Sequence, residues 1–379
     1  MFLTERLFGV GVYVSILAIT CFALSRSGSH SYKRILSLYL LAIGILAYLY
    51  VPYVQADLDR LVEYMFVYAD MSWPDFMQAI GESNAPVTLV YYRLIGSLHI
   101  AGLLSGITTL IVFWNVFHII KGATKKISAH GTSVALTLLA IMSTGLYMQT
   151  VGNIRTMLAF SIIARAFYSE SFNNRPLYKN IVWYIIAALI HPAAVVAVAI
   201  RFGVLFVNTA RKRMTRKLLG MSLVLVPTVV LLLKYGASLI DNVLEKADVY
   251  INEVTYTYLW DNVISLLIIA LLIIALIVNM RHPIKSNKTS LNDTMIMSVV
   301  LILFSLATMF EHATFVRFTQ LNLMISAPLL LSSFHTLSSQ STKTRKSTIV
   351  TRALITIIVV ILVISATRGA LSSLKFFVL

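Results

Sequence analysis

Residues 262–280 read NVISLLIIALLIIALIVNM, a run of 19 residues without a charged side chain. A helix needs about 20 predominantly apolar residues to cross a bilayer, so this run predicts a membrane-spanning helix. Across the chain, hydrophobic residues make up 58% of the 379 residues and charged residues only 12%, whereas a soluble domain has roughly 25% charged residues. The composition predicts an all-α, polytopic transmembrane protein, and the short alternating segments of a β-barrel are absent.

Apolar stretches of similar character recur along the chain and predict about twelve spans in one transmembrane domain over residues 1–379. No internal repeat and no soluble domain is expected. The predicted spans are 7–25, 34–51, 98–120, 131–149, 152–168, 179–191, 193–209, 218–234, 262–280, 292–310, 315–333 and 349–367.

The loops between these spans alternate in charge. A net charge of +16 can indicate a nucleic-acid partner, but here the basic residues lie in short loops, as the positive-inside rule expects of cytoplasmic loops. We therefore predict that the basic loops are cytoplasmic and that the acidic loops face outward. The single cysteine, Cys21, lies in an apolar span and offers neither a disulfide nor a metal site.

All basic loops can lie on one side of the membrane and all acidic loops on the other only if the chain turns at His191-Pro192 without reaching the cytoplasm. The arms 179–191 and 193–209 then form a short broken hairpin, because proline ends or kinks a helix. This arrangement places both chain ends outside. The first span has no small-residue cleavage site after it and is expected to be retained.

Two predicted outer loops are long enough to fold. Residues 52–97 have a mixed pattern with Trp73 and two prolines, and we expect interfacial helices there, with a possible return into the membrane near 86–97. Residues 235–261 are rich in Tyr, Asp and Asn. Aromatic residues suit the boundary between water and lipid.

Several charged or titratable residues lie on the predicted outer side against the positive-inside trend. An arginine facing lipid there costs free energy, but it is tolerated beside a wet cavity or an anion. Arginine offers a planar set of donors that fits phosphate oxygens, and a neutral histidine can accept a proton from an attacking hydroxyl. The residues concerned are Arg60, Arg93, Arg155 and Arg317, with His191, Glu311 and His312.

Structural explanations compete with these chemical ones. Arg155 and Arg317 could be interfacial side chains that extend toward the headgroups, and Arg93 could lie flat in the interface. His191 could cap the bend of its hairpin, and His312 could form a structural pair with Glu311. Arg60 follows two aspartates, Asp57 and Asp59, and could only neutralise them.

The stretch Gly152-Asn153-Ile154-Arg155-Thr156, followed by Leu189-Ile190-His191-Pro192-Ala193, resembles the EpsG family of Wzy-like polysaccharide polymerases. Arg317-Phe318 is similar to the second arginine of that family, and Asp57-Leu58-Asp59-Arg60 to its aspartate-containing first outer loop. Two features depart from the family pattern. Thr156 replaces the usual glutamine after the arginine, and the arginine often found before the first-loop aspartate is missing unless Arg60 or Arg93 substitutes for it.

The resemblance implies a GT-C-like architecture and a polymerase that joins repeat units carried on undecaprenyl pyrophosphate. The site is expected on the periplasmic face of a bacterial cytoplasmic membrane, without a metal or other cofactor, and a chain-length regulator and a flippase are possible partners. The family resemblance and the charged residues on the predicted outer side together give two sets of expected site residues. The catalytic set is His191, Arg155, Arg317 and Glu311, and the substrate-binding set is Arg60, Arg93, Asn153, Asp57, Asp59 and His312.

Three alternatives stay open from the sequence. An O-antigen ligase or another lipid-linked glycosyltransferase would use a similar arginine and histidine site with a different acceptor. A metal-dependent version would use Asp57 and Asp59 as its carboxylates. A flippase or transporter is less consistent with the sequence, because transporters usually show internal repeats and paired broken helices.

Overall fold

The computed structural model describes residues 2–28, 31–51, 57–210, 256–282, 288–340 and 345–371, and every regular element in them is an α-helix. The all-α prediction is therefore confirmed for this part of the chain. The helices are α1 Phe2–Arg26, α2 Tyr32–Tyr48, α3 Asp57–Asp70, α4 Trp73–Glu82, α5 Pro86–Gly96, α6 Gly102–Ile127, α7 Gly131–Ser143, α8 Leu146–Gly152, α9 Ile154–Asn173, α10 Leu177–Ile190, α11 Pro192–Ala210, α13 Tyr256–Arg281, α14 Lys288–Ala307, α15 His312–Ile325, α16 Ala327–Gln340 and α17 Arg345–Leu371.

Helices occupy every predicted span except 218–234, which lies outside the described residues, as does most of the second outer loop. By length and hydropathy, five of the described helices can cross a membrane, or up to seven spans if two bent pairs each count as one. The structure therefore supports a multi-pass membrane protein. The twelve-span topology remains a prediction.

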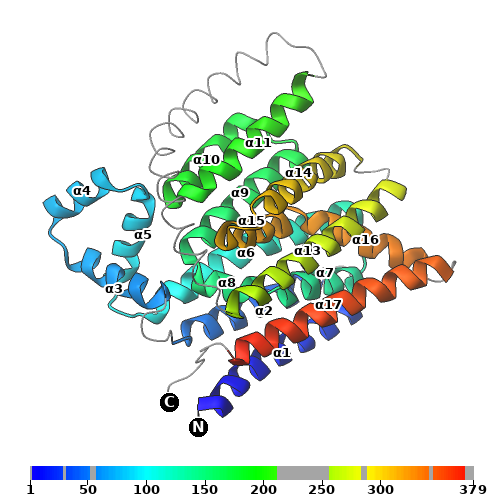
Figure 1. The fold of residues 1–379 in the computed structure, drawn as a ribbon, viewed down its shortest axis with the longest axis horizontal. Helices are drawn as coiled ribbons and strands as arrows, with labels where there is room; N and C mark the ends of the chain where they lie inside the picture. Colours follow the sequence, from blue (N-terminus) through cyan, green and yellow to red (C-terminus); the bar gives the residue numbers. More distant parts are fainter. Residues whose placement is uncertain are drawn as a thin grey trace.

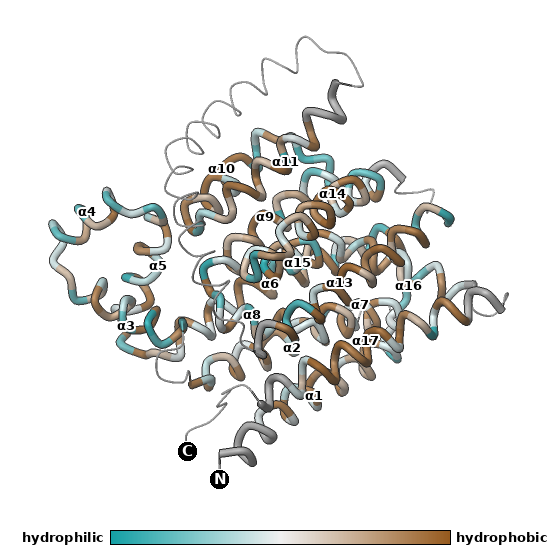
Figure 2. The backbone as a smooth tube through the Cα atoms, viewed as in Figure 1, coloured by the Kyte–Doolittle hydropathy of each residue, from teal (hydrophilic) through white to brown (hydrophobic). Residues whose placement is uncertain are grey.

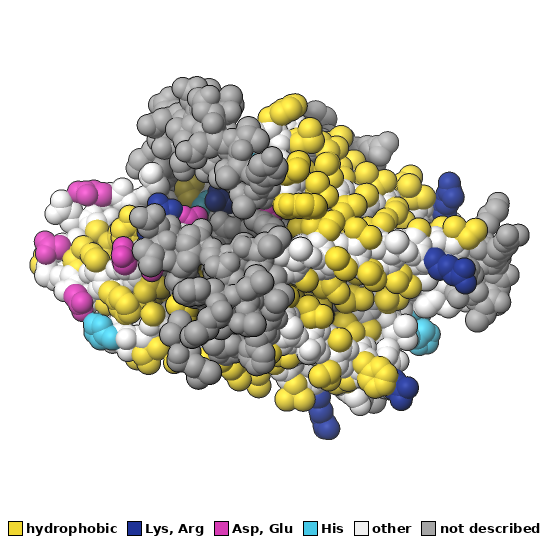
Figure 3. All heavy atoms as spheres, turned by 60° about the horizontal axis from the view of Figure 1, so that its bottom comes forward, with side chains coloured by type: hydrophobic (Ala, Val, Ile, Leu, Met, Phe, Trp, Pro, Cys, Tyr) yellow, Lys and Arg dark blue, Asp and Glu magenta, His cyan; other side chains and the backbone are white. Residues whose placement is uncertain are grey.

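The long helices pack side by side, and α3, α4 and α5 project together from one end of the bundle (Figure 1). Apolar residues dominate the lengths of the long helices (Figure 2). In the face shown in Figure 3, acidic side chains gather at the end formed by α3–α5 and most Lys and Arg side chains lie at the opposite end. We name these the outer end and the inner end, following the sidedness that the loops predict.

Two helices that the sequence analysis took as continuous spans are broken. α7 and α8 meet at 46° and α15 and α16 at 56°. The first break includes Gly145, whose φ of 75° is a left-handed conformation that glycine adopts at little cost. The first break contacts α15, because Gln320 Nε2 in that helix donates to the Thr144 carbonyl oxygen over 3.1 Å. The expectation of a single broken hairpin was therefore incomplete. Pro328 stands at the second position of α16, directly after the second break, whereas the first break contains no proline.

A buried ion pair joins α9 to α11 within the bundle. Arg201 Nη2 lies 2.8 Å from Glu170 Oε2, and the two side chains are 4% and 6% exposed. The Arg201 guanidinium also lies over the Phe167 ring, 4.7 Å from its centroid. The sequence analysis missed this pair because Arg201 falls inside the predicted span 193–209. Charges in spans usually face the bundle interior and pair with one another.

Candidate functional site

The outer segment α3–α5 is anchored to the bundle through α5. Thr88 Oγ1 donates to the Ile190 carbonyl oxygen over 2.7 Å in a buried contact. On the side facing α6, the Tyr91 and Thr108 hydroxyl groups lie 2.7 Å apart. α5 therefore contacts the last residue of α10, directly before the His191-Pro192 bend.

His191 links the bend to the start of α9. Its Nδ1 accepts a hydrogen bond from the Ala193 N–H over 3.1 Å, and its Nε2 lies 3.2 Å from Thr156 Oγ1. A neutral ring that accepts at Nδ1 carries its proton at Nε2 and donates to Thr156. The expected capping role is therefore present in the structure. His191 could act as a base at Nε2 only if the ring proton moved to Nδ1 and the Ala193 contact were released.

Arg155 lies in the first turn of α9, next to Thr156, and its side chain is exposed. Its positive charge acts on the hydroxyl of Tyr92 in α5: burial raises the pKa of Tyr92, and Arg155 counteracts part of this rise. Tyr92 is 2% exposed, and its hydroxyl has no hydrogen-bond partner among the described residues. We call Tyr92, Arg155, Thr156 and His191 the Arg155 cluster.

Asn153 lies between α8 and α9, directly before this cluster. Its Nδ2 donates to Gln149 Oε1 over 2.6 Å. The amide therefore connects the two helices at the point where α9 begins. A contact between Asn153 and substrate remains a prediction.

A second group of polar residues lies where α15 begins. Glu311 Oε2 accepts from the Thr314 N–H over 2.6 Å and so caps the helix. His312 Nδ1 lies 2.9 Å from Asn262 Oδ1, and His312 Nε2 lies 3.5 Å from Asp261 Oδ2. Asp261 is buried. Glu311 therefore stabilises the helix start, and the histidine contacts Asp261 while the charge of Glu311 also acts on its ring.

The two predicted arginine positions belong to helices that pack together. The Phe160 ring of α9 lies 5.3 Å from the Phe318 ring of α15, measured between centroids. Arg155 precedes Phe160 on α9, and Arg317 directly precedes Phe318 on α15. Arg317 follows His312 by five residues on α15, and its charge acts on the His312 ring.

The two arginines of the outer segment have partners within that segment. Arg60 forms an exposed ion pair with Asp57 in the same helix, α3. The Arg93 guanidinium lies over the rings of Trp73 and Phe76, at 4.8 and 4.4 Å from their centroids. It also donates to the Tyr68 carbonyl oxygen over 3.3 Å, so it joins α5 to α3 and α4. The Arg60 contact matches the structural explanation given for that residue, and Arg93 is held by its own segment.

The carboxylates of the metal-dependent alternative, Asp57 and Asp59, lie in the first turn of α3. Asp57 contacts Arg60, as described above. Within the described ranges, no group of three or more His, Cys, Asp or Glu side chains is arranged to hold a metal ion.

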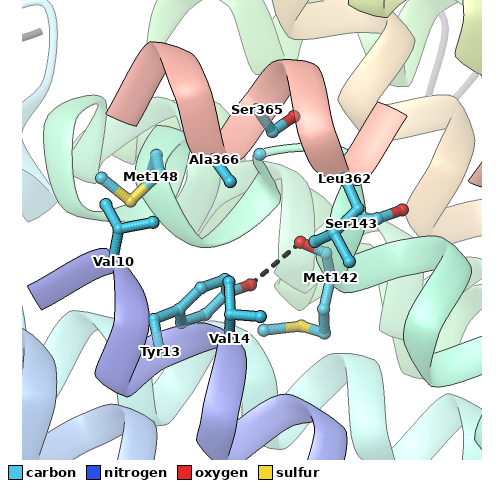
Figure 4. A pocket seen from close by; sticks show the side chains of 10 residues that line it. Val10, Tyr13, Val14, Met142, Ser143, Met148, Leu362, Ser365 and Ala366 are labelled. Atoms are coloured by element: carbon cyan, nitrogen blue, oxygen red, sulfur yellow. Dashed lines mark hydrogen bonds between the residues drawn. The ribbon is translucent and has the colours of Figure 1, made fainter. Parts of the chain in front are cut away.

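A small cavity of about 30 Å³ lies away from the predicted site residues, between α1, the α7–α8 break and α17 (Figure 4). Its lining is almost entirely apolar and includes Val10, Met142, Met148 and Leu362. Tyr13 beside it donates to the Met142 carbonyl oxygen over 2.9 Å. None of the residues expected to act on substrate lines this cavity.

Several residues of the candidate site escaped the sequence analysis. Thr88 carried no signal, because a threonine in a short outer helix has many possible partners. Tyr92 was not among the expected site residues, and Thr156 appeared only as a departure from the family motif. Asp261 was assigned to an outer loop without a partner. Only the packing of α5, α9 and α13 shows what these side chains contact.

Comparison with known proteins agrees with the resemblance noted in the sequence. The family model described as "EpsG family" matches residues 90–377, which include the Arg155 cluster and the start of α15. No curated protein and no solved structure gives a significant match to this chain.

Proposed function

The chain belongs to the EpsG family, and we propose that it is a polysaccharide polymerase that joins undecaprenyl-pyrophosphate-linked repeat units on the outer face of a bacterial cytoplasmic membrane. The donor is a growing glycan on this carrier, and the acceptor is a single repeat unit on the same kind of carrier. The observation that carries the proposal is the Arg155 cluster. Where α5 contacts the end of α10, the charge of the exposed Arg155 acts on the buried Tyr92 hydroxyl, which has no partner among the described residues.

In the proposed reaction, an acceptor hydroxyl oxygen attacks the anomeric carbon of the donor. The bond between that carbon and the pyrophosphate oxygen breaks, and undecaprenyl pyrophosphate leaves with the electron pair. The hydroxyl proton passes to a base. Arginines stabilise such a reaction because they neutralise the charge that develops on the leaving oxygen.

We assign Arg155 to the pyrophosphate, with the Tyr92 hydroxyl as a neutral donor beside it. A buried hydroxyl without a partner leaves a hydrogen bond unmade, and a phosphate oxygen held by Arg155 would complete it. Arg317, on the neighbouring helix α15, is assigned to the same pyrophosphate. Replacing Arg317 with lysine removes the planar pair of donors and is expected to impair transfer.

The proposed base is one of two histidines with different surroundings. His191 would have to release Ala193 before it accepts a proton at Nε2. His312 lies beside the buried carboxylate of Asp261, an arrangement that stabilises an imidazolium after proton transfer. Single-turnover rates of His191→Gln and His312→Gln as a function of pH distinguish them. The variant that lacks the base loses the ionisation on the acidic side of the wild-type profile.

The decisive experiment supplies the purified protein with a defined undecaprenyl-pyrophosphate oligosaccharide. A ladder of products that grows by whole repeat units supports a polymerase. Transfer only to a foreign acceptor means a ligase and overturns the proposal. Activity that is lost with EDTA and restored by a divalent cation would favour the carboxylates of the metal-dependent version.

The two bent helix pairs are a specific observation in favour of a lipid-linked glycan transporter, because broken helices often form transporter sites. Proteoliposomes that carry a labelled lipid-linked repeat unit test this second candidate. Movement of the label across the bilayer without any joining of repeat units would support transport. Joining without movement supports the polymerase.

A further inference from the structure

A positively charged group of side chains lies in the inner halves of α6 and α9, about three turns along α9 from Arg155. Arg165 of α9 is half-buried, and its Nη1 donates to Asn115 Oδ1 of α6 over 3.0 Å. Asn115 Nδ2 in turn donates to Ser161 Oγ over 3.1 Å. A neutral amide therefore orients the guanidinium, and no carboxylate among the described residues pairs with it.

Two further cations, Lys121 and Arg175, act electrostatically on the same region. The charges of Arg165, Lys121 and Arg175 all act on the ring of His118. Within the part of the chain that the structure describes, none of these three cations forms an ion pair with a carboxylate. Glu170, the acidic residue of α9, is paired with Arg201 of α11. Positive charge is thus concentrated at this point without an acidic partner.

α6 lies between α2 and α9 and has one exposed side between them. Residues of an α-helix are about 100° apart around its axis, so Trp114, His118 and Lys121 form one stripe along α6. On one side of this stripe, Lys121 Nζ donates to Ser37 Oγ of α2 over 3.1 Å. On the other side, Asn115 reaches α9. The stripe is therefore open between the two neighbouring helices.

Tyr168 of α9 borders this stripe. Its ring packs edge-on against His118, with 6.4 Å between ring centroids. Its hydroxyl lies against Gly122 of α6, where a larger residue would collide with it. The hydroxyl is buried without a hydrogen-bond partner among the described residues. An unused donor thus lies next to unbalanced positive charge.

We propose that the inner ends of α2, α6 and α9 bind the phosphate headgroup of an anionic phospholipid, through His118, Lys121 and Arg165. The adjoining surface is apolar: Trp114, one turn before His118, is 54% exposed, and Leu38 and Leu41 of α2 are 68% and 56% exposed. Such a surface suits acyl chains, and basic pockets between helices on the cytoplasmic side bind anionic headgroups. A soluble phosphate would use the cations but not the apolar surface.

Lipid retention by the full-length protein tests the site without any reference to polymerase activity. The protein is purified in micelles that contain phosphatidylglycerol and phosphatidylcholine, and bound lipid is counted by native mass spectrometry. Wild type is expected to retain phosphatidylglycerol preferentially. The variant Lys121→Gln/Arg165→Gln is expected to bind it about 25-fold more weakly, at about fivefold for each basic residue removed.

Arg281→Gln is the matched control, because it removes an exposed basic side chain at the end of α13 in another predicted basic loop. It should retain the lipid as wild type does. Lys121→Gln alone, at a partly exposed position, covers the case in which the double variant fails to fold. Equal retention by wild type and Lys121→Gln overturns the proposal, as does full displacement of the lipid by glycerol 1-phosphate, which would indicate a soluble phosphate ligand.

Discussion

The Thr88 hydroxyl donates a hydrogen bond to the Ile190 carbonyl oxygen over 2.7 Å, across 102 residues of sequence. The acceptor belongs to the last turn of α10, where helix carbonyl groups lack intrahelical partners. This bond holds α5 against the bend that carries His191. The outer segment and the broken hairpin are thereby positioned together, and the Arg155 cluster lies between them.

Thr88→Val should loosen this attachment. The substitution leaves the Ile190 carbonyl oxygen buried without its donor, which costs about 1–3 kcal/mol. We expect a lower unfolding temperature in detergent and a smaller yield of long glycan chains. Ser97→Ala is the control, because the Ser97 hydroxyl makes an exposed contact with Leu94 within the same turn. Equal stability of wild type and Thr88→Val would show that the bond does not anchor α5.

Arg155→Ala should leave the protein inserted in the membrane and reduce glycan products to single repeat units. Loss of one donor to a developing negative charge lowers rates by about 100-fold or more. The comparison variant is Arg60→Ala, which removes an outer arginine whose observed partner is Asp57. Chain lengths are compared on gels at matched protein levels. Normal chains from Arg155→Ala would remove this residue from the proposed site.

Tyr92→Phe separates a role in binding from a role in folding. Because the Tyr92 hydroxyl is buried without a described partner, its removal should leave thermal stability unchanged or slightly higher. Transfer should fall by about tenfold or more, since hydrogen bonds to charged groups contribute about 1.5–3 kcal/mol. Both quantities are measured on the same preparation. A less stable but fully active variant would mean that the hydroxyl supports the fold instead.

Arg201→Met should destabilise the helix group α9–α11 strongly. Removing one partner of a buried ion pair leaves an uncompensated charge and costs about 3–5 kcal/mol. The double variant Glu170→Gln/Arg201→Met removes both charges and should recover much of the lost stability. Thermal unfolding of the two variants measures the difference. If the single and double variants are equally unstable, packing of Arg201 on Phe167 matters more than the charge of Glu170.

Gly145→Ala tests the break between α7 and α8. Its φ of 75° lies in the left-handed region, where a residue with a Cβ pays roughly 1–2 kcal/mol. Among the described residues, only Ser365 Oγ lies within 4 Å of a Cβ added at Gly145. A loss of stability in this variant would therefore come from backbone strain and not from a steric clash. Gly203→Ala is the control, because that glycine lies inside α11 with nothing within 4 Å of an added Cβ. Alanine there should stabilise the helix.

Some contacts of the site could be predicted from neighbouring residues. The pairing of Arg60 with Asp57 joins residues three positions apart on one helix, a spacing at which charged side chains meet. The capping position of His191 follows from the proline after it. Arg93 could not be assigned in this way, because its aromatic partners come from α4 and its carbonyl partner from the end of α3.

The amino-acid sequence alone predicts a helical, membrane-spanning chain, and it indicates which loops share a side. Hydropathy and loop charge are properties of short segments, so they can be read without knowing how helices pack. Helix packing is needed to show that Thr156 contacts His191, that the charge of Arg155 acts on Tyr92 and that Arg201 pairs with Glu170. This is because lipid is as apolar as the interior of the bundle. Hydropathy therefore does not distinguish a helix face that meets lipid from one that meets another helix, and the partner of each polar side chain depends on that difference.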